Sequence, residues 1–263
     1  MHTKGLAVTL AVLNLLGFLG TIIVNGLANA LPLNNRNTGE LSDLYPNLFV
    51  PAALTFSIWG LIYILLAIFV VYHLVSAFRA QTTAPAFSGR IGVLFFISCI
   101  ANIGWICAWH YEMLPLSLFF MLVLLACLLS VYLRLNIGKS SADGKEKYMV
   151  HLPFSVYLGW ITIATIANVT ALLVNAGWGG WGLSEALWTV LVITVGIAIA
   201  LAVIFTRKDI FYGLVVDWAI LGILIKRLSV DIFPVQSVVI TVIAGLVLIT
   251  LAILAQLIRK KVY

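Results

Sequence analysis

The sequence predicts an all-α polytopic membrane protein, a bundle of about eight transmembrane helices. Of its 263 residues, 63% are hydrophobic and only 9% are charged, whereas a soluble domain carries about 25% charged residues. The mean hydropathy of +1.15 agrees. The apolar residues form long blocks without the alternation of a membrane β-barrel, and helices satisfy their own backbone groups in lipid. This composition excludes a disordered chain, a cytosolic enzyme and, despite a pI near 9.3, a nucleic-acid-binding protein.

Eight apolar blocks are long enough to be considered as spans, since crossing a bilayer takes about 20 helical residues. The block at 210–227 is the least certain in type, because it is short, contains Asp217 and ends at Lys226 and Arg227. The eight predicted spans are residues 5–28, 52–78, 91–109, 115–133, 149–176, 184–205, 210–227 and 235–258.

The first break, from Leu31 to Pro51, is the longest and carries the prolines Pro46 and Pro51. Loops of this length without periodicity are usually functional or mobile, so we expect it to cover a binding site as a lid. Its acidic residues, Glu40 and Asp43, could contact the polar edge of a ligand, although simple solvation is the favoured interpretation. The later break at 138–147 is rich in polar residues and the one at 177–182 is rich in glycine, as turns are.

The distribution of basic residues predicts the topology. If the N-terminus is cytoplasmic and all eight blocks span, 12 of the 15 Lys and Arg residues lie inside, including Lys260 and Lys261 near the end of the chain. Only Arg36, Lys226 and Arg227 lie outside. Cytoplasmic loops carry the positive excess, so both termini are expected in the cytoplasm, with the plasma (inner) membrane of a bacterium as the location.

The first block has a second interpretation. Lys4, an apolar stretch and Ala28-Asn29-Ala30 together imitate a signal peptide with its cleavage site. The stretch from Gly5 to Ala28 is 24 residues long, however, and the apolar region of a signal peptide has about 7–15 residues. A retained first span is therefore favoured; cleavage would leave seven spans.

Cysteine and histidine residues predict neither a metal site nor a disulfide framework. Cys99, Cys107 and Cys127 all lie inside apolar blocks without CxxC spacing, where cysteine behaves as a small buried residue. No cofactor and no metal are expected.

Aromatic and amide residues recur at helical spacing within three of the spans: Trp59-x3-Tyr63, Asn102-x2-Trp105 and Trp160-x7-Asn168. Residues three or four apart share a helix face, and converging faces of this kind would line an aromatic cavity with a few hydrogen-bonding groups. The alternative is that the asparagines join helices through hydrogen bonds while the aromatic rings fill gaps.

These motifs resemble the TspO/translocator family of tryptophan-rich sensory proteins over about residues 5–177. The resemblance lies in Trp59-Gly60-x2-Tyr63 after a proline-containing loop, Asn102-x2-Trp105 in the third span, and Trp160 with Asn168 in the fifth. It implies a five-helix core and a ligand such as a tetrapyrrole or a sterol, held by these six residues. Residues 178–263 have no counterpart in this resemblance and are interpreted as an extension of about three helices.

Asp217 is the sharpest candidate outside that core, because an ionisable residue within a span is by default a functional hypothesis. It could relay a proton or a cation, which makes a secondary transporter the alternative function. A shallow helix that brings Asp217 to the interface is the other interpretation. Asp217 is the only acid in the interior of the predicted spans. General acid–base catalysis therefore lacks a second acidic group there, and no enzymatic activity is expected.

The expected function is therefore a membrane ligand-binding or sensory protein for an apolar, porphyrin-like or sterol-like molecule. Other expected partners are membrane lipid and a second copy in a homodimer, since small-residue faces allow close helix contacts; no nucleic acid is expected. Three further tryptophans, Trp178, Trp181 and Trp188, are interpreted as part of the aromatic belt at the membrane interface.

Overall fold

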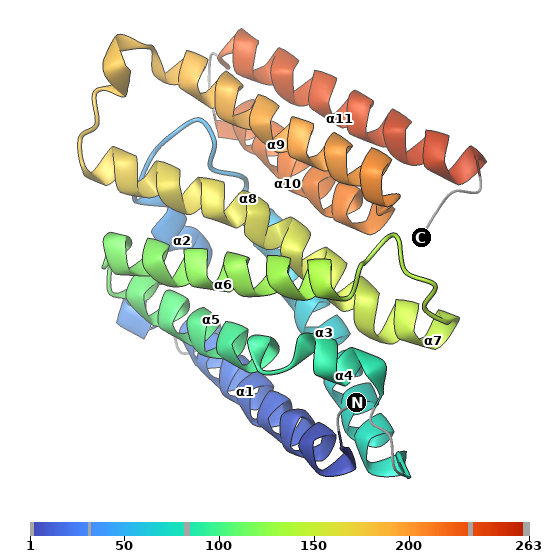
Figure 1. Cartoon of the computed structure of the whole chain (residues 1–263). Coiled ribbons are helices and arrows are strands. Elements are labelled where there is room, and N and C mark those ends of the chain that lie inside the picture. The colour runs from blue at the N-terminus through green and yellow to red at the C-terminus, as the bar shows by residue number, and fades with distance from the viewer. Residues whose placement is uncertain (1–2, 31–32, 82–84, 231–233, 260–263) are drawn as a thin grey trace. The chain divides into compact units, whose positions relative to one another are not determined.

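The computed structural model describes residues 3–30, 33–81, 85–230 and 234–259. Within these ranges the ordered elements are helices, and there is no strand (Figure 1). The predicted all-α membrane bundle is therefore confirmed. Residues 31–32 of the predicted lid and the basic residues Lys260 and Lys261 lie outside the described residues.

Eight long helices follow the eight predicted blocks closely. They are α1 (Lys4–Ala30), α3 (Ile58–Arg79), α5 (Leu94–His110), α6 (Leu114–Arg134), α8 (Leu152–Asn175), α9 (Glu185–Arg207), α10 (Ile210–Val230) and α11 (Gln236–Ile258). Shorter helices lie between them: α2 (Thr38–Asp43), α4 (Ala86–Ile91), α7 (Gly144–Glu146), the 3-10 turns η1 (Leu33–Asn35), η2 (Ala53–Ser57) and η4 (Gly180–Gly182), and a π-helical turn η3 (Lys147–His151).

Six of the long helices are long and apolar enough to cross a membrane. The exceptions are α5, which has 17 residues, and α10, which carries Asp217, Lys226 and Arg227. The chain is thus a polytopic helical protein. Its α5 is short for a transmembrane span, and its α10 is rich in charged residues for one.

Local sequence sets several helix ends. Ser184 is the N-cap of α9, and its hydroxyl accepts a hydrogen bond from Leu187 N at 3.3 Å, as N-cap residues do. At the other end of α9, Lys208 adopts the left-handed conformation with φ 58° and starts the tight turn into α10. The predicted break at 177–182 contains glycines with positive φ, Gly177 and Gly180 among them.

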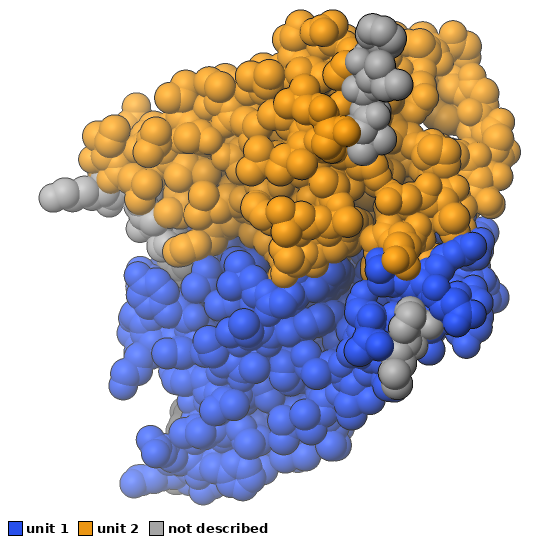
Figure 2. Space-filling model, turned by 180° about the vertical axis from the view of Figure 1, so that it is seen from behind, with its two compact units in different colours: residues 1–37, 59–158 blue, residues 38–58, 159–263 orange. Residues whose placement is uncertain are grey.

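The described chain forms two compact units (Figure 2). Unit 1 comprises residues 1–37 and 59–158, and unit 2 comprises residues 38–58 and 159–263. Each unit combines segments far apart in the sequence, and helix α8 supplies residues to both. The division at residue 177, which rests on sequence motifs alone, stays a separate prediction.

In unit 1, helix α5 packs against both α1 and α6 (Figure 1). Glycines allow this close approach: a Cβ on Gly17 of α1 would lie 2.9 Å from the Phe96 ring, and one on Gly104 of α5 would lie 2.7 Å from the Phe120 ring. Small residues at such positions are typical of membrane helix contacts, where packing drives association. The first helix is thus an integral part of this unit.

In unit 2, helices α9, α10 and α11 all pack against one another (Figure 1). Glycines again lie at the contacts, since a Cβ on Gly213 of α10 would lie 2.6 Å from Ile204 of α9. Helix α10 also contacts the turn η2. There Gly222 packs so closely on Thr55 that any added Cβ would overlap the threonine side chain.

The predicted lid loop is more structured than its sequence suggests. Residues Thr38–Asp43 form the helix α2, in which Leu41 is fully buried. Asp43 also forms an ion pair with Lys226 of α10, so simple solvation does not describe it. In unit 1, Arg36 forms a 3.0 Å ion pair with Glu112.

Candidate functional site

Four aromatic residues of unit 1 form what we call the stacked cluster: Trp59 and Tyr63 of α3, Trp105 of α5 and Tyr157 of α8. Trp59 lies at its centre. Its ring stacks on Tyr63 and on Trp105, with centroid distances of 5.6 Å in both cases. The Tyr157 ring meets Trp59 edge to face at 6.0 Å and 70°. Both geometries are favourable for aromatic pairs.

An amide chain joins this cluster to the first helix. Asn25 Nδ2 of α1 donates to Asn102 Oδ1 at 2.8 Å, and Asn102 Nδ2 donates to the Tyr157 hydroxyl oxygen at 3.0 Å. Asn102 is completely buried. Its amide therefore links α1, α5 and α8, which is the interhelical role that the sequence allows as the alternative to ligand binding.

Two hydrogen-bond donors of the stacked cluster are buried in the described part of the chain and make no hydrogen bond there. Within the described part of the chain, neither the Tyr63 hydroxyl nor Trp105 Nε1 has a hydrogen-bond partner. A buried donor left unpaired costs about 1–3 kcal/mol, and native structures contain few of them. A hydrogen bond from either group to a polar atom of a ligand or to a water molecule would remove that cost for the group concerned.

Of the six residues predicted to bind the ligand, the structure therefore brings four together in unit 1: Trp59, Tyr63, Asn102 and Trp105. The other two, Trp160 and Asn168, belong to unit 2. Trp160 meets the Phe56 ring edge to face at 6.0 Å and 82°, and Asn168 is buried in α8. The ligand-binding role of all six stays a prediction.

The sequence motifs missed two members of the unit 1 network. Tyr157 lies three residues before Trp160 and differs from an ordinary core aromatic only through its hydroxyl group. Asn25 carries a stronger signal, because an amide in an otherwise apolar span needs a partner. To pair Asn25 with Asn102, one must know that their two helices are neighbours. The sequence motifs do not contain that information.

A cavity of about 620 Å³ lies in unit 2, a volume typical of small-molecule sites. Its apolar wall comes from α8, with Ile166, Val169 and Leu173, while α9 contributes Thr189 and Val192. The remaining lining comes from the turn between these helices and from the loop around residues 47–49. The loop that the sequence predicts as a lid thus supplies part of a cavity wall.

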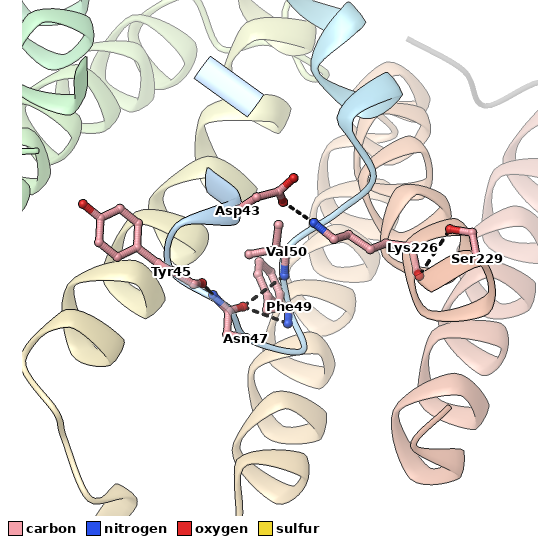
Figure 3. A network of polar contacts seen from close by, with 7 residues as sticks. All are labelled: Asp43, Tyr45, Asn47, Phe49, Val50, Lys226 and Ser229. Carbon is pink, nitrogen blue, oxygen red and sulfur yellow. Dashed lines mark hydrogen bonds and ion pairs between the residues drawn. The ribbon is translucent and has the colours of Figure 1, made fainter. Parts of the chain in front are cut away.

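Asn47 holds that loop in shape (Figure 3). Its Oδ1 accepts hydrogen bonds from Phe49 N at 2.9 Å and from Val50 N at 3.0 Å, while its Nδ2 donates to Tyr45 O at 2.7 Å. Asparagine side chains organise turns in this way. Both Asn47 and Phe49 line the cavity, and the two predicted lid prolines, Pro46 and Pro51, flank the segment. Pro46 is exposed and Pro51 is buried.

Contacts to α10 fasten the end of this loop. Ala52 N donates to Gly222 O at 2.9 Å, and Trp218 Nε1 donates to Thr55 O at 3.0 Å. At the other end Asp43 pairs with Lys226 (Figure 3). The loop is therefore anchored on both sides of the residues that line the cavity.

Three tryptophans form what we call the tryptophan rim: Trp178, Trp181 and Trp188. Their ring centroids lie 5.0–5.6 Å apart. Trp188 Nε1 donates to Gly180 O at 2.7 Å, which fixes the ring over the turn. Trp178 and Trp188 line the cavity, whereas Trp181 is 81% exposed. The assignment of these three tryptophans to an aromatic belt at the membrane interface stays a prediction.

Asp217 faces helix α11, and its Oδ2 accepts a hydrogen bond from Thr250 Oγ1 at 2.8 Å. Among the described residues its Oδ1 is buried without a partner. In the same described ranges, no group of three or more His, Cys, Asp or Glu side chains is placed to hold a metal ion.

Comparison with known proteins identifies one matching protein family. A family model described as TSPO-like protein matches residues 11–255. The match runs through the stacked cluster and the cavity, and it continues across residue 177 into the C-terminal helices. No curated protein and no solved structure matches the chain.

Proposed function

Since the chain belongs to the TSPO-like protein family, we propose that it binds a largely apolar small molecule within its membrane helices. Its place as an integral membrane protein of TspO type follows from that membership and from its long apolar helices. Ligand binding is the part that needs an experiment.

The observation that carries the proposal is the cavity of about 620 Å³ in unit 2. Apolar side chains of α8 and α9 and two tryptophan rings line it, with few polar groups. Sites for small molecules are usually concave, mostly apolar and largely preformed, and the Asn47 turn and its anchors preform this one. Flat apolar molecules such as tetrapyrroles or sterols, which the resemblance to the translocator family implies, are the ligand class proposed.

Protoporphyrin quenching of tryptophan fluorescence tests this function. Val169→Phe adds volume to the α8 wall of the cavity and should weaken binding at least about fivefold, because overpacking costs about 1–3 kcal/mol and 1.4 kcal/mol is tenfold. Val195→Phe is the matched control, since Val195 of α9 is 54% exposed and does not line the cavity. Equal affinity in wild type and Val169→Phe would remove the cavity as the site.

The six predicted residues offer the competing location. If the ligand instead lies at the stacked cluster, its polar atoms could pair with the Tyr63 hydroxyl and Trp105 Nε1. Trp105→Phe would then weaken protoporphyrin binding more than Val169→Phe does. The same titration with Trp160→Phe tests whether Trp160, the remaining predicted tryptophan, takes part in binding.

Transport coupled to protons or cations is the second candidate function. It rests on Asp217, whose Oδ1 has no partner among the described residues. If Asp217 carries the coupling, Asp217→Asn abolishes substrate-stimulated proton flux in vesicles and leaves ligand binding in the cavity unchanged. Flux that persists in Asp217→Asn would remove this candidate.

A further inference from the structure

Among the described residues that line the cavity of unit 2, a single one is charged, Glu185 at the start of α9. Its other polar lining residues are Asn47 and three threonines. The side-chain amide of Asn47 is hydrogen-bonded within its own loop. The hydroxyls of Thr165 and Thr170 donate to carbonyls of their own helix at 2.7 and 2.9 Å. The charge available to a ligand is therefore negative.

Glu185 is only partly engaged by the protein. Its Oε1 accepts a hydrogen bond from Leu48 N at 2.9 Å. Within the described residues, no hydrogen bond uses Oε2 and no Lys, Arg or His forms an ion pair with Glu185. The N-cap of α9 is Ser184, so capping the helix does not require the Glu185 carboxylate.

Two tryptophan rings line the same cavity as this carboxylate. Trp178 and Trp188 line the cavity together with Glu185, and Trp181 packs on both rings from outside the lining. Tryptophan is the best aromatic partner for a cation, and aromatic groups of this kind recognise quaternary ammonium ligands. A carboxylate and two indole rings around an apolar cavity thus suit an organic cation with an apolar body.

We propose that the cavity selects amphiphilic organic cations, with the positive group held by Glu185 and the tryptophan rim and the apolar body held between α8 and α9. This inference rests on the proposed function and adds the charge of the ligand. A ligand with a carboxylate at this end would meet Glu185 and be repelled, so acidic tetrapyrroles would bind less tightly than a cation of similar shape.

Three probes of one ring shape test the charge preference: N-methylacridinium, acridine at a pH where it is neutral, and acridine-9-carboxylate. Each is titrated against the full chain in a non-ionic detergent, with tryptophan quenching as the readout. The cation should bind about tenfold more tightly than the neutral probe, a difference of about 1.4 kcal/mol, because the Glu185 carboxylate and the indole rings attract its positive charge. The anion should bind most weakly.

Glu185→Gln is the decisive variant, because glutamine keeps an oxygen that accepts from Leu48 N and loses only the charge. It should remove the tenfold preference, so that N-methylacridinium and neutral acridine bind the variant with similar affinity. Glu40→Gln is the matched control: Glu40 is an exposed acid of α2 in the same unit and does not line the cavity. Trp178→Phe should weaken the cation about threefold more than it weakens neutral acridine, as expected for a cation–π change of 0.5–1 kcal/mol.

The failures of the two proposals are distinguishable. If acridine and N-methylacridinium bind equally in wild type and Glu185→Gln changes neither, the cation preference is wrong and the binding function stands. If neither acridine probe nor protoporphyrin binds, the binding function itself is wrong. Phosphatidylcholine added to the detergent identifies the source of the cation: competition with N-methylacridinium assigns the site to a lipid headgroup, and the lack of competition assigns it to a free cation.

Discussion

The stacked cluster of unit 1 and the cavity of unit 2 use the same residue type in opposite ways. In the stacked cluster, Trp59 and Trp105 lie against each other and fill the space between helices. In the cavity, Trp178 and Trp188 form a wall around a volume of about 620 Å³. Tryptophan content alone therefore does not distinguish packing from a binding site. Rings contact other rings in both regions, and the difference is that Trp178 and Trp188 also border a cavity.

The largest effect expected from this comparison is on stability. Trp105 is 5% exposed and stacked on Trp59, so Trp105→Ala should lower the free energy of unfolding by about 3–5 kcal/mol, the usual cost of deleting a buried large aromatic. Trp178→Ala removes a cavity-wall residue and should cost less than half of that. Unfolding in detergent, followed by circular dichroism, measures both.

A reversed order in that experiment would break the comparison. If Trp178→Ala destabilised more than Trp105→Ala, the tryptophan rim would be a packing core. Ligand binding should show the opposite order: Trp178→Ala should weaken it more than Trp105→Ala does, since Trp178→Ala removes part of the cavity wall.

The anchor of the cavity loop should show the next largest effect. Gly222→Ala places a methyl group against Thr55, and overpacking of this kind costs about 1–3 kcal/mol. Hydrogen exchange at residues 44–52 should increase with it, because Ala52 N donates to Gly222 O. Gly60→Ala in unit 1 is the control, since nothing lies within 4 Å of a Cβ there. Unchanged exchange in Gly222→Ala would show that the anchor is dispensable.

The smallest effect is expected at the second fastening of the loop. Lys226 pairs with Asp43, whose side chain is 54% exposed. Exposed ion pairs contribute about 0–1 kcal/mol, so Lys226→Met should lower the free energy of unfolding by less than about 1 kcal/mol. Arg36→Met, which breaks the ion pair of unit 1 with Glu112, should behave alike. A loss above 2 kcal/mol in Lys226→Met alone would make this ion pair a principal anchor.

The sequence by itself determined that this protein lies in a membrane and that its secondary structure is helical. Long apolar blocks separated by glycine, proline and polar breaks specify helices and their approximate ends, because lipid allows no unsatisfied backbone. The resemblance that rests on Trp59, Asn102 and Trp160 also identified the family, which the match over residues 11–255 confirms. These features are local, and a single chain segment carries each of them.

Only the tertiary structure decided which of these residues meet. The motifs place Trp59 and Trp105 on helix faces, and the stacking of the two rings, one from α3 and one from α5, makes them one cluster. Asn25 and Tyr157 join it through bonds that span 77 and 55 residues of sequence. The cavity likewise combines residues 47–49 with α8 and α9. A site assembled from distant segments depends on which helices are neighbours, and apolar helix surfaces of similar composition do not encode that choice in any one segment.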